Sequence, residues 1–208
     1  MFTNLHVHSA YSFLDGLASP KELAQTAAQH GLPALALTDL HSLSGAIEFY
    51  DACQEVGVQP ILGLEVRVIP SPPNSLPEGE GGKRREGEEI SASNLILLAT
   101  DPSGWSSLCK LASLVQGHAD ALPFERFAQN TDGLLCLSGG LRGLATQLVR
   151  QNQPDSAEAW LSELANLFPG RLYLELQNHT PQDAALNSHL ARLGRALKLP
   201  LVATHNIH

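Results

Sequence analysis

The sequence predicts a single α/β domain in which short buried strands alternate with amphipathic helices. The 208 residues are enough for one large domain with one hydrophobic core. Short apolar runs alternate with stretches of about a dozen residues that carry helical periodicity, as repeated βα units around a parallel sheet do. About seven of these runs have the character of strands. We therefore predict a barrel of the triosephosphate-isomerase type.

Turn and cap residues separate the predicted elements. Ser19, Pro20 and Glu22 predict the start of the first helix, and Gly31 and Gly57 predict the ends of the first two. The predicted strands cover residues 4–9, 34–39, 60–69, 94–99, 133–138, 171–177 and 199–208. The predicted helices cover residues 19–31, 44–57, 106–116, 154–168 and 183–198, and residues 139–150 lie between a strand and a helix.

Residues 70–93 interrupt this alternation with a segment rich in Pro, Gly, Ser and charge, so we expect a flexible insertion. The basic residues 83–85 could contact phosphates, but a short charged run in a Gly-rich loop is more often merely solvated. Strand and helix patterns resume after residue 93, so the insertion does not divide the chain. We expect one domain over residues 1–208.

Composition excludes several functional classes. A formal charge of −8 argues against nucleic-acid binding through a broad basic surface. Three widely spaced cysteines form no CxxC pair, which disfavours a disulfide framework or a thiolate zinc site and favours a reducing cytoplasm. No export signal and no run of about 20 apolar residues occurs, so we expect no membrane contact.

Histidines and carboxylates lie at the carboxyl ends of several predicted strands. In parallel sheets and barrels the working side chains gather at the carboxyl ends of the strands. Imidazole and carboxylate groups are the usual ligands of zinc, manganese and iron, and such ions promote phosphoester hydrolysis. The candidate residues at or just after these ends are His6, His8, Asp15, Asp39, His41, Glu65, His205 and His208.

Each candidate has a structural alternative. The spacing of His6 and His8 puts both rings on one face of a strand. Such an HxH pair also occurs where that face is simply exposed to solvent. Asp39, which we take as the candidate catalytic residue, could instead cap the following helix. Glu65 is more informative, because a carboxylate in an apolar strand is costly unless it is paired or bound to metal. His205 and His208 are three residues apart and would not share a strand face.

Several spaced motifs resemble the polymerase and histidinol phosphatase (PHP) domain found at the N-terminus of bacterial DNA polymerase III alpha subunits. They are LHVHSAYSFLDG, ALALTDLHSLSGAIEFYDACQEVGVQPILGLEV, LLCLSGGLRG, LYLELQNH and LPLVATHNIH, in that order. The resemblance covers essentially the whole chain. It implies a distorted seven-stranded (β/α) barrel that holds up to three zinc or manganese ions in a cleft used for phosphoester hydrolysis. In active polymerase relatives this activity is a 3′–5′ exonuclease.

The resemblance also implies a ligand set, of which five residues match in type: His6, His8, Asp15, Glu65 and His208. Four other ligand positions depart from the family pattern and fall on Leu40, Asn94, Gly140 and Asn206. Leucine and glycine offer no ligand atom, and asparagine offers a weak neutral oxygen. His41 lies beside Leu40 and His205 beside Asn206, so shifted histidines could restore part of the set, and His179 is a further candidate.

Three functions follow from the resemblance. The chain could be a metal-dependent phosphoesterase or exonuclease that acts on single-stranded DNA or a small phosphoester. It could instead be a degenerate domain that supports the rest of the polymerase chain and offers a surface to a proofreading or clamp subunit, which the four departures favour. The third candidate is a free-standing phosphatase of the histidinol phosphate type. We expect the chain to be the N-terminal part of a longer polymerase involved in DNA replication.

Overall fold

The computed structural model describes residues 2–13, 15–70, 92–117 and 121–207. The strands are β1 (Ala34–Leu37), β2 (Gln59–Ile69), β3 (Ser93–Ala99), β4 (Leu122–Pro123), β5 (Leu134–Leu137), β6 (Leu172–Leu176) and β7 (Leu201–Ala203). The helices are α1 (Pro20–Gln29), α2 (Ala46–Val56), α3 (Pro102–Gln116), α4 (Phe124–Ala128), the 3₁₀ turn η1 (Gly140–Arg142), α5 (Leu144–Arg150), α6 (Pro154–Leu167) and α7 (Asp183–Ala196). Residues 71–91, most of the expected insertion with its basic run, lie outside the described residues.

The strands of the described part form one sheet in the order β1-β2-β3-β5-β6-β7, with β4 beside β2. The expected alternation of strands and helices is confirmed, but the expectation of an all-parallel sheet is wrong at β3. This strand pairs antiparallel with both β2 and β5. Parallel neighbours need a crossover connection that is usually helical, and the Pro- and Gly-rich sequence before β3 predicts none.

The N-terminal segment contains isolated bridges where a regular strand was expected. Asn4 pairs with Leu35 of β1, and Val7 pairs with Ile207 near the other end of the chain. The His8 N–H donates to the Ile207 carbonyl at 2.9 Å. The observed fold is therefore a mixed α/β structure with a curled, half-barrel sheet, and the complete seven-stranded barrel stays a prediction.

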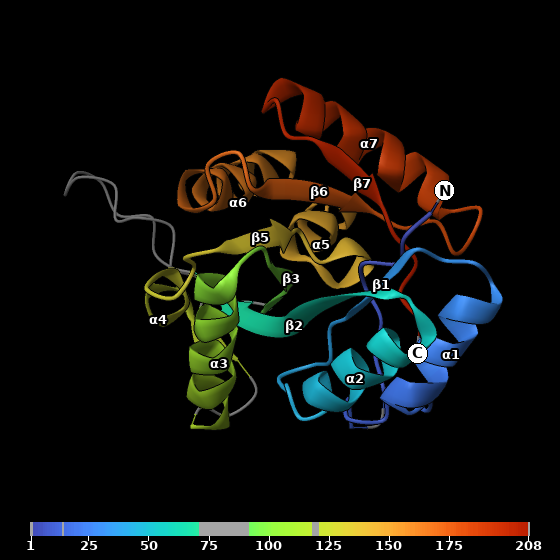
Figure 1. Ribbon diagram of the computed structural model, residues 1–208. Helices are drawn as coiled ribbons and strands as arrows, with labels where there is room; N and C mark the ends of the chain where they lie inside the picture. Colours follow the sequence, from blue (N-terminus) through green and yellow to red (C-terminus); the bar gives the residue numbers. More distant parts are fainter. Residues whose placement is uncertain (1, 14, 71–91, 118–120, 208) are drawn as a thin grey trace.

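Helices cover the outside of the curled sheet. Figure 1 shows α1 and α2 beside β1, α3 beside β2, and α6 and α7 beside β6 and β7. The largest apolar cluster lies between the sheet and these helices and includes Leu64, Leu97 and Leu161. A smaller cluster, which includes Ile96 and Leu137, lies on the other face. Glu65 faces Ile96 directly in the β2–β3 register, so its carboxylate belongs to this inner face.

The start of α1 follows the sequence prediction. The Ser19 side chain accepts a hydrogen bond from the Glu22 N–H, and the Ser19 N–H donates to the Glu22 carboxylate, which forms a capping box. At the end of α2, Gly57 adopts a φ of 75°, which glycine accepts without strain. The predicted start of α1 and the predicted end of α2 are thus confirmed.

We expect Ser19→Ala to lower the free energy of unfolding by about 1 kcal/mol, because the first turn of α1 loses its side-chain acceptor. Urea denaturation followed by circular dichroism measures this change. Ser106→Ala is the matched control, since Ser106 is an exposed residue inside α3 and alanine is the better helix former there. Equal unfolding midpoints for Ser19→Ala and the unmodified chain would show that the capping box contributes nothing.

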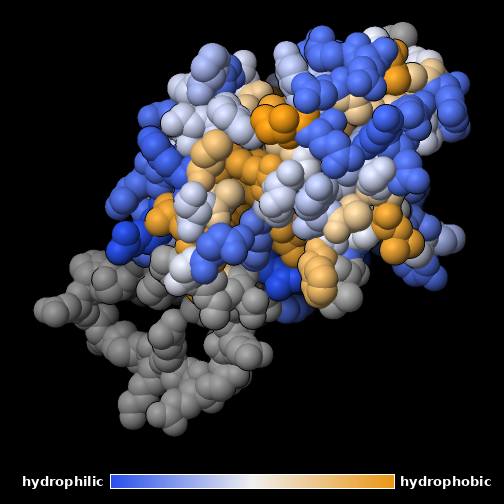
Figure 2. Space-filling view, turned by 60° about the horizontal axis from the view of Figure 1, so that its bottom comes forward, coloured by the Kyte–Doolittle hydropathy of each residue, from blue (hydrophilic) through white to orange (hydrophobic). Residues whose placement is uncertain are grey.

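The surface combines hydrophilic and apolar areas. Figure 2 shows hydrophobic residues gathered across the middle of one face, with hydrophilic residues around them. Phe13 and Leu17, in the loop between His8 and α1, are 88% and 92% exposed. None of the helices in the described ranges is both long enough and apolar enough to cross a bilayer.

Candidate metal centre

Two histidines and one glutamate form a buried cluster on the inner face of the sheet. His6 and His8 come from the N-terminal segment, Glu65 comes from β2, and each is at most 1% exposed. The Nε2 atoms of His6 and His8 lie 3.2 and 2.5 Å from the same oxygen, Glu65 Oε2. Within the described part of the chain, this is the one group of histidine, cysteine and acidic residues whose ligand atoms all lie within 4.8 Å of one another.

Local backbone structure brings these three side chains together. His6 and His8 flank Val7, whose side chain packs in the cluster that includes Ala24 and Phe49 and so turns the two rings to the other side. Beside the site, the Glu65 N–H donates to the Asp39 carbonyl at 3.1 Å, which joins β2 to the segment after β1. The expectation that HxH and Glu65 meet therefore agrees with the geometry.

Asn94 stands at one of the positions that depart from the family pattern, and it contacts Glu65. Its Nδ2 donates a hydrogen bond to Glu65 Oε1 at 2.5 Å. The amide thus satisfies the glutamate oxygen that does not face the histidines. An asparagine in this orientation offers its donor, not a ligand atom, to the site.

Hydrogen bonds and charges within the cluster favour the charged forms of His6 and Glu65. Burial on its own lowers the pKa of His6, but hydrogen bonds to Glu175 and Glu65 and the charges of those carboxylates raise it to about 9. Burial on its own raises the pKa of Glu65, but hydrogen bonds and charge from His6 and His8 hold it well below its usual range. An ion that binds here competes with the proton on His6 Nε2.

Glu175, in β6, is a site residue that the sequence reasoning missed. It is fully buried, and its Oε1 lies 3.0 Å from His6 Nδ1. The signal was present in the sequence, because Glu175 interrupts an apolar strand just as Glu65 does, and the same cost of burial applies.

Asp39 and Asp15 contact other groups. Asp39 accepts hydrogen bonds from the Ser9 N–H at 2.6 Å, the Ser9 hydroxyl at 2.7 Å and the Ser12 hydroxyl at 2.7 Å. The helix-cap alternative for Asp39 is wrong, because α2 begins after Gly45. Asp15 receives two hydrogen bonds from the Arg142 guanidinium, at 2.7 and 3.2 Å, and lies 3.8 Å from His8 Nδ1.

The remaining predicted ligands lie away from the three-residue cluster or outside the described residues. His41 has a φ of 58°, and its Nε2 accepts a hydrogen bond from the Arg67 N–H at 3.0 Å. The exposed rings of His205 and His179 lie against each other, with centroids 4.6 Å apart. His208 lies outside the described residues.

Gly140 stands at a position where the family pattern has a metal ligand, and in this chain another side chain fills the space beside it. A Cβ at this position would lie 2.4 Å from Gln177 Cδ, so the Gln177 side chain fills the space that a side chain at 140 would need. Gln177 Oε1 accepts a bond from the Leu141 N–H, and Gln177 Nε2 donates to Glu175 Oε1 at 3.0 Å. A glutamine amide therefore bridges the η1 turn and Glu175.

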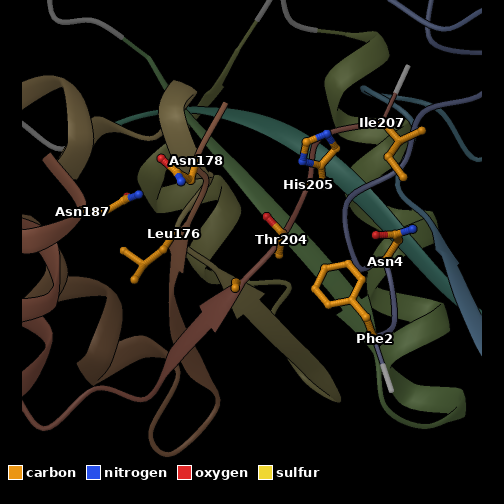
Figure 3. Close-up of a pocket in the computed structure, with 9 residues that line it drawn as sticks. Phe2, Asn4, Leu176, Asn178, Asn187, Thr204, His205 and Ile207 are labelled. Atoms are coloured by element: carbon orange, nitrogen blue, oxygen red, sulfur yellow. The ribbon is translucent and has the colours of Figure 1, made fainter. Parts of the chain in front are cut away.

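A surface pocket of about 540 Å³ lies beside the buried cluster. Figure 3 shows Phe2, Asn4 and His205 on one side of it, and Leu176, Asn178 and Asn187 on the other. None of the three cluster residues lines the pocket, although Thr204 lines it and also contacts Glu175. The pocket therefore lies next to the candidate metal centre but is separate from it.

Comparison with solved structures identifies proteins of the same fold. One is a protein from Bifidobacterium adolescentis assigned as a metal-dependent phosphoesterase, with a TM-score of 0.55, 14% identity and coverage of 99% of this chain and 87% of that one. Another is an amidohydrolase from Chromobacterium violaceum with bound sulfate and no metal, with a TM-score of 0.53, 15% identity and the same coverage. At these identities the likeness concerns the fold.

Sequence relatives are bacterial DNA polymerases. The chain is 40% identical over its whole length to an error-prone DNA polymerase from Symbiobacterium thermophilum, of which it covers 19%. It is 35% and 33% identical to DNA polymerase III alpha subunits from Thermus aquaticus and Caulobacter vibrioides, of which it covers 17% and 18%. The chain thus spans about a fifth of the length of these relatives, and the part it matches is their N-terminal domain. Residues 4–179 match the PHP domain, and the chain belongs to the PHP domain family.

Proposed function

We propose that this chain is the PHP domain of a DNA polymerase III alpha-like protein and that it binds one divalent metal ion through His6, His8 and Glu65. The observation that carries the proposal is the convergence of three buried ligand atoms, two imidazole nitrogens and one carboxylate oxygen, within 4.8 Å. The likeness to polymerases along the whole chain supports its assignment to a longer replication protein.

The donor set fits zinc or manganese. Two imidazoles and a carboxylate are a common set for a catalytic zinc ion, which keeps a position open for substrate, and manganese accepts the same groups. Glu175 Oε2 is a buried oxygen without a hydrogen-bond partner among the described residues, which adds a second negative group close to His6. When bound, a divalent ion supplies a Lewis acid that polarises a phosphoryl oxygen and activates water.

Phosphoester hydrolysis is the activity that this centre supports best. The candidate substrates are the 3′ end of single-stranded DNA, as for a 3′–5′ exonuclease, and a small phosphoester. In this proposal His6, His8 and Glu65 hold the ion, and Asp39 fixes the loop that carries Ser9 and Ser12. A catalytic role for Asp39 and metal ligation by Asp15, His41, His205 and His208 stay predictions.

A structural role is the second candidate, and specific contacts favour it. Arg142 binds Asp15 through two hydrogen bonds, so a fixed cation already neutralises a carboxylate that the resemblance assigns to a metal. Amides of Asn94 and Gln177 donate to Glu65 and Glu175. These contacts stabilise a site with fewer ions than the family maximum and are compatible with a scaffold.

The rest of the polymerase chain is the partner that we propose first. The likeness to one part of longer polymerase chains supports this partner, and the side chains of Phe13 and Leu17, 88% and 92% exposed, are the candidates for the contact. A proofreading or clamp subunit is the further candidate for this contact. A cytoplasmic location agrees with this assignment, because replication polymerases act on the chromosome.

Metal analysis of protein purified without chelator tests the proposal. We expect about one zinc or manganese ion per chain, lost in His8→Ala and kept in His189→Ala, whose histidine is exposed on α7. Hydrolysis of single-stranded DNA or a phosphomonoester, stopped by chelator, supports the enzymatic role. Stable metal without turnover on either substrate supports the structural role. Absence of metal overturns the proposal.

A further inference from the structure

We propose that Glu175 is a positioning residue that fixes the His6 ring so that its Nε2 faces the metal centre. This inference rests on the proposed metal site and deepens it. A histidine ligand has two ring nitrogens, and the hydrogen bond at one of them decides which nitrogen is left to bind an ion. The structure places a carboxylate at the nitrogen of His6 that does not face Glu65.

The two nitrogens of His6 have different partners. Nδ1 lies 3.0 Å from Glu175 Oε1 and 3.2 Å from Gln177 Nε2, an amide that donates to the same Glu175 oxygen, whereas Nε2 lies 3.2 Å from Glu65 Oε2. An ionised carboxylate only accepts hydrogen bonds, so the contact with Glu175 places a proton on Nδ1. When an ion displaces the proton on Nε2, the proton on Nδ1 stays with Glu175, and Nε2 is the nitrogen left to bind the ion. His6 and Glu175 are 1% and 0% exposed, so water does not replace this contact.

Glu175 is itself held in place from three directions. The Thr204 hydroxyl and Gln177 Nε2 both donate to Oε1, the oxygen that faces His6. The Glu175 N–H donates to the Ser138 hydroxyl at 2.9 Å, which joins β6 to the end of β5. A carboxylate oriented by several donors positions a ring more accurately than a freely rotating one.

Glu175 is buried at a cost in free energy, and its contact with His6 accounts for a carboxylate at this position. Its Oε2 has no hydrogen-bond partner within the described ranges, although a buried and unpaired carboxylate oxygen is costly. An apolar residue of similar size would avoid this cost and would fit the apolar pattern of β6. The contact with His6 is the interaction that such a residue could not make.

Zinc affinity and the NMR signal of His6 test the inference in the full chain. We expect Glu175→Gln to weaken zinc binding by about 10- to 100-fold in competition with a chromogenic chelator. In zinc-loaded unmodified protein, ¹H–¹⁵N NMR is expected to show a slowly exchanging proton on His6 Nδ1, and this proton exchanges rapidly in Glu175→Gln. Glu175→Asp keeps the charge but withdraws the oxygen from His6, so we expect it to weaken zinc binding as well.

Asp183→Asn is the matched control, because Asp183 is a buried carboxylate that accepts backbone hydrogen bonds after β6 and makes no contact with His6. It should keep both the zinc affinity and the His6 signal. Unchanged affinity and an unchanged His6 signal in folded Glu175→Gln and Glu175→Asp overturn the positioning role and leave the metal site standing. Failure of the unmodified chain to bind either zinc or manganese overturns both the metal site and this inference.

Discussion

Replacement of Glu65 by glutamine is expected to lower zinc affinity by at least about 100-fold, because the cluster loses its anionic ligand. Both His6 Nε2 and His8 Nε2 approach the same glutamate oxygen, so the substitution removes the carboxylate oxygen that the two rings share. Isothermal titration calorimetry on the unmodified chain and on Glu65→Gln measures the difference directly.

The same substitution is expected to destabilise the metal-free protein by about 3 kcal/mol, since removal of one partner leaves the His6 charge buried with less compensation. Urea denaturation in the presence of chelator measures this change. Glu158→Gln, on the exposed face of α6, is the control for loss of a carboxylate and should leave zinc affinity and stability unchanged. Retention of zinc affinity by Glu65→Gln would contradict the proposed ligand set.

Gly139→Ala is expected to lower the free energy of unfolding by about 4 kcal/mol or to prevent folding. Gly139 follows β5 with a φ of 87°, and a Cβ there would lie 1.8 Å from the backbone oxygen of Asn94. A backbone atom cannot move aside as a side chain can, so β3 or the η1 turn must shift. Because Asn94 also donates to Glu65, such a shift would disturb the metal centre.

Gly170→Ala separates the clash from the cost of the backbone conformation. Gly170 also has a positive φ, 70°, but a Cβ there would have no neighbour within 4 Å. We expect a loss of about 1 kcal/mol, the cost of the left-handed conformation for alanine. Thermal unfolding of the two variants measures both effects. Equal destabilisation by Gly139→Ala and Gly170→Ala would show that the close approach to Asn94 is not a constraint.

The sequence predicted the part of the site that depends on local patterns. His6 and His8 share a face because they are two residues apart, and Glu65 stands out because an apolar strand rarely contains a carboxylate. Both signals concern the burial and direction of side chains along one segment. Both signals are local, so they point to the three cluster residues without any knowledge of contacts between distant segments.

The sequence could not predict which polar groups meet across the fold. Arg142 and Asp15 are 127 positions apart, and nothing in either segment indicates that they pair. The antiparallel course of β3 depends on the connection before it, whereas the apolar pattern of the strand is the same in either direction. His41 lies beside Leu40, but its positive φ and its bond with the Arg67 N–H depend on the turn after β1.

Anomalous X-ray diffraction at the zinc edge, on crystals grown from protein purified without chelator, tests the central claim most directly. The account predicts one strong zinc peak within bonding distance of His6 Nε2, His8 Nε2 and a Glu65 oxygen. A zinc peak found only at the exposed His179 and His205 rings, or no peak in zinc-saturated crystals, would contradict it.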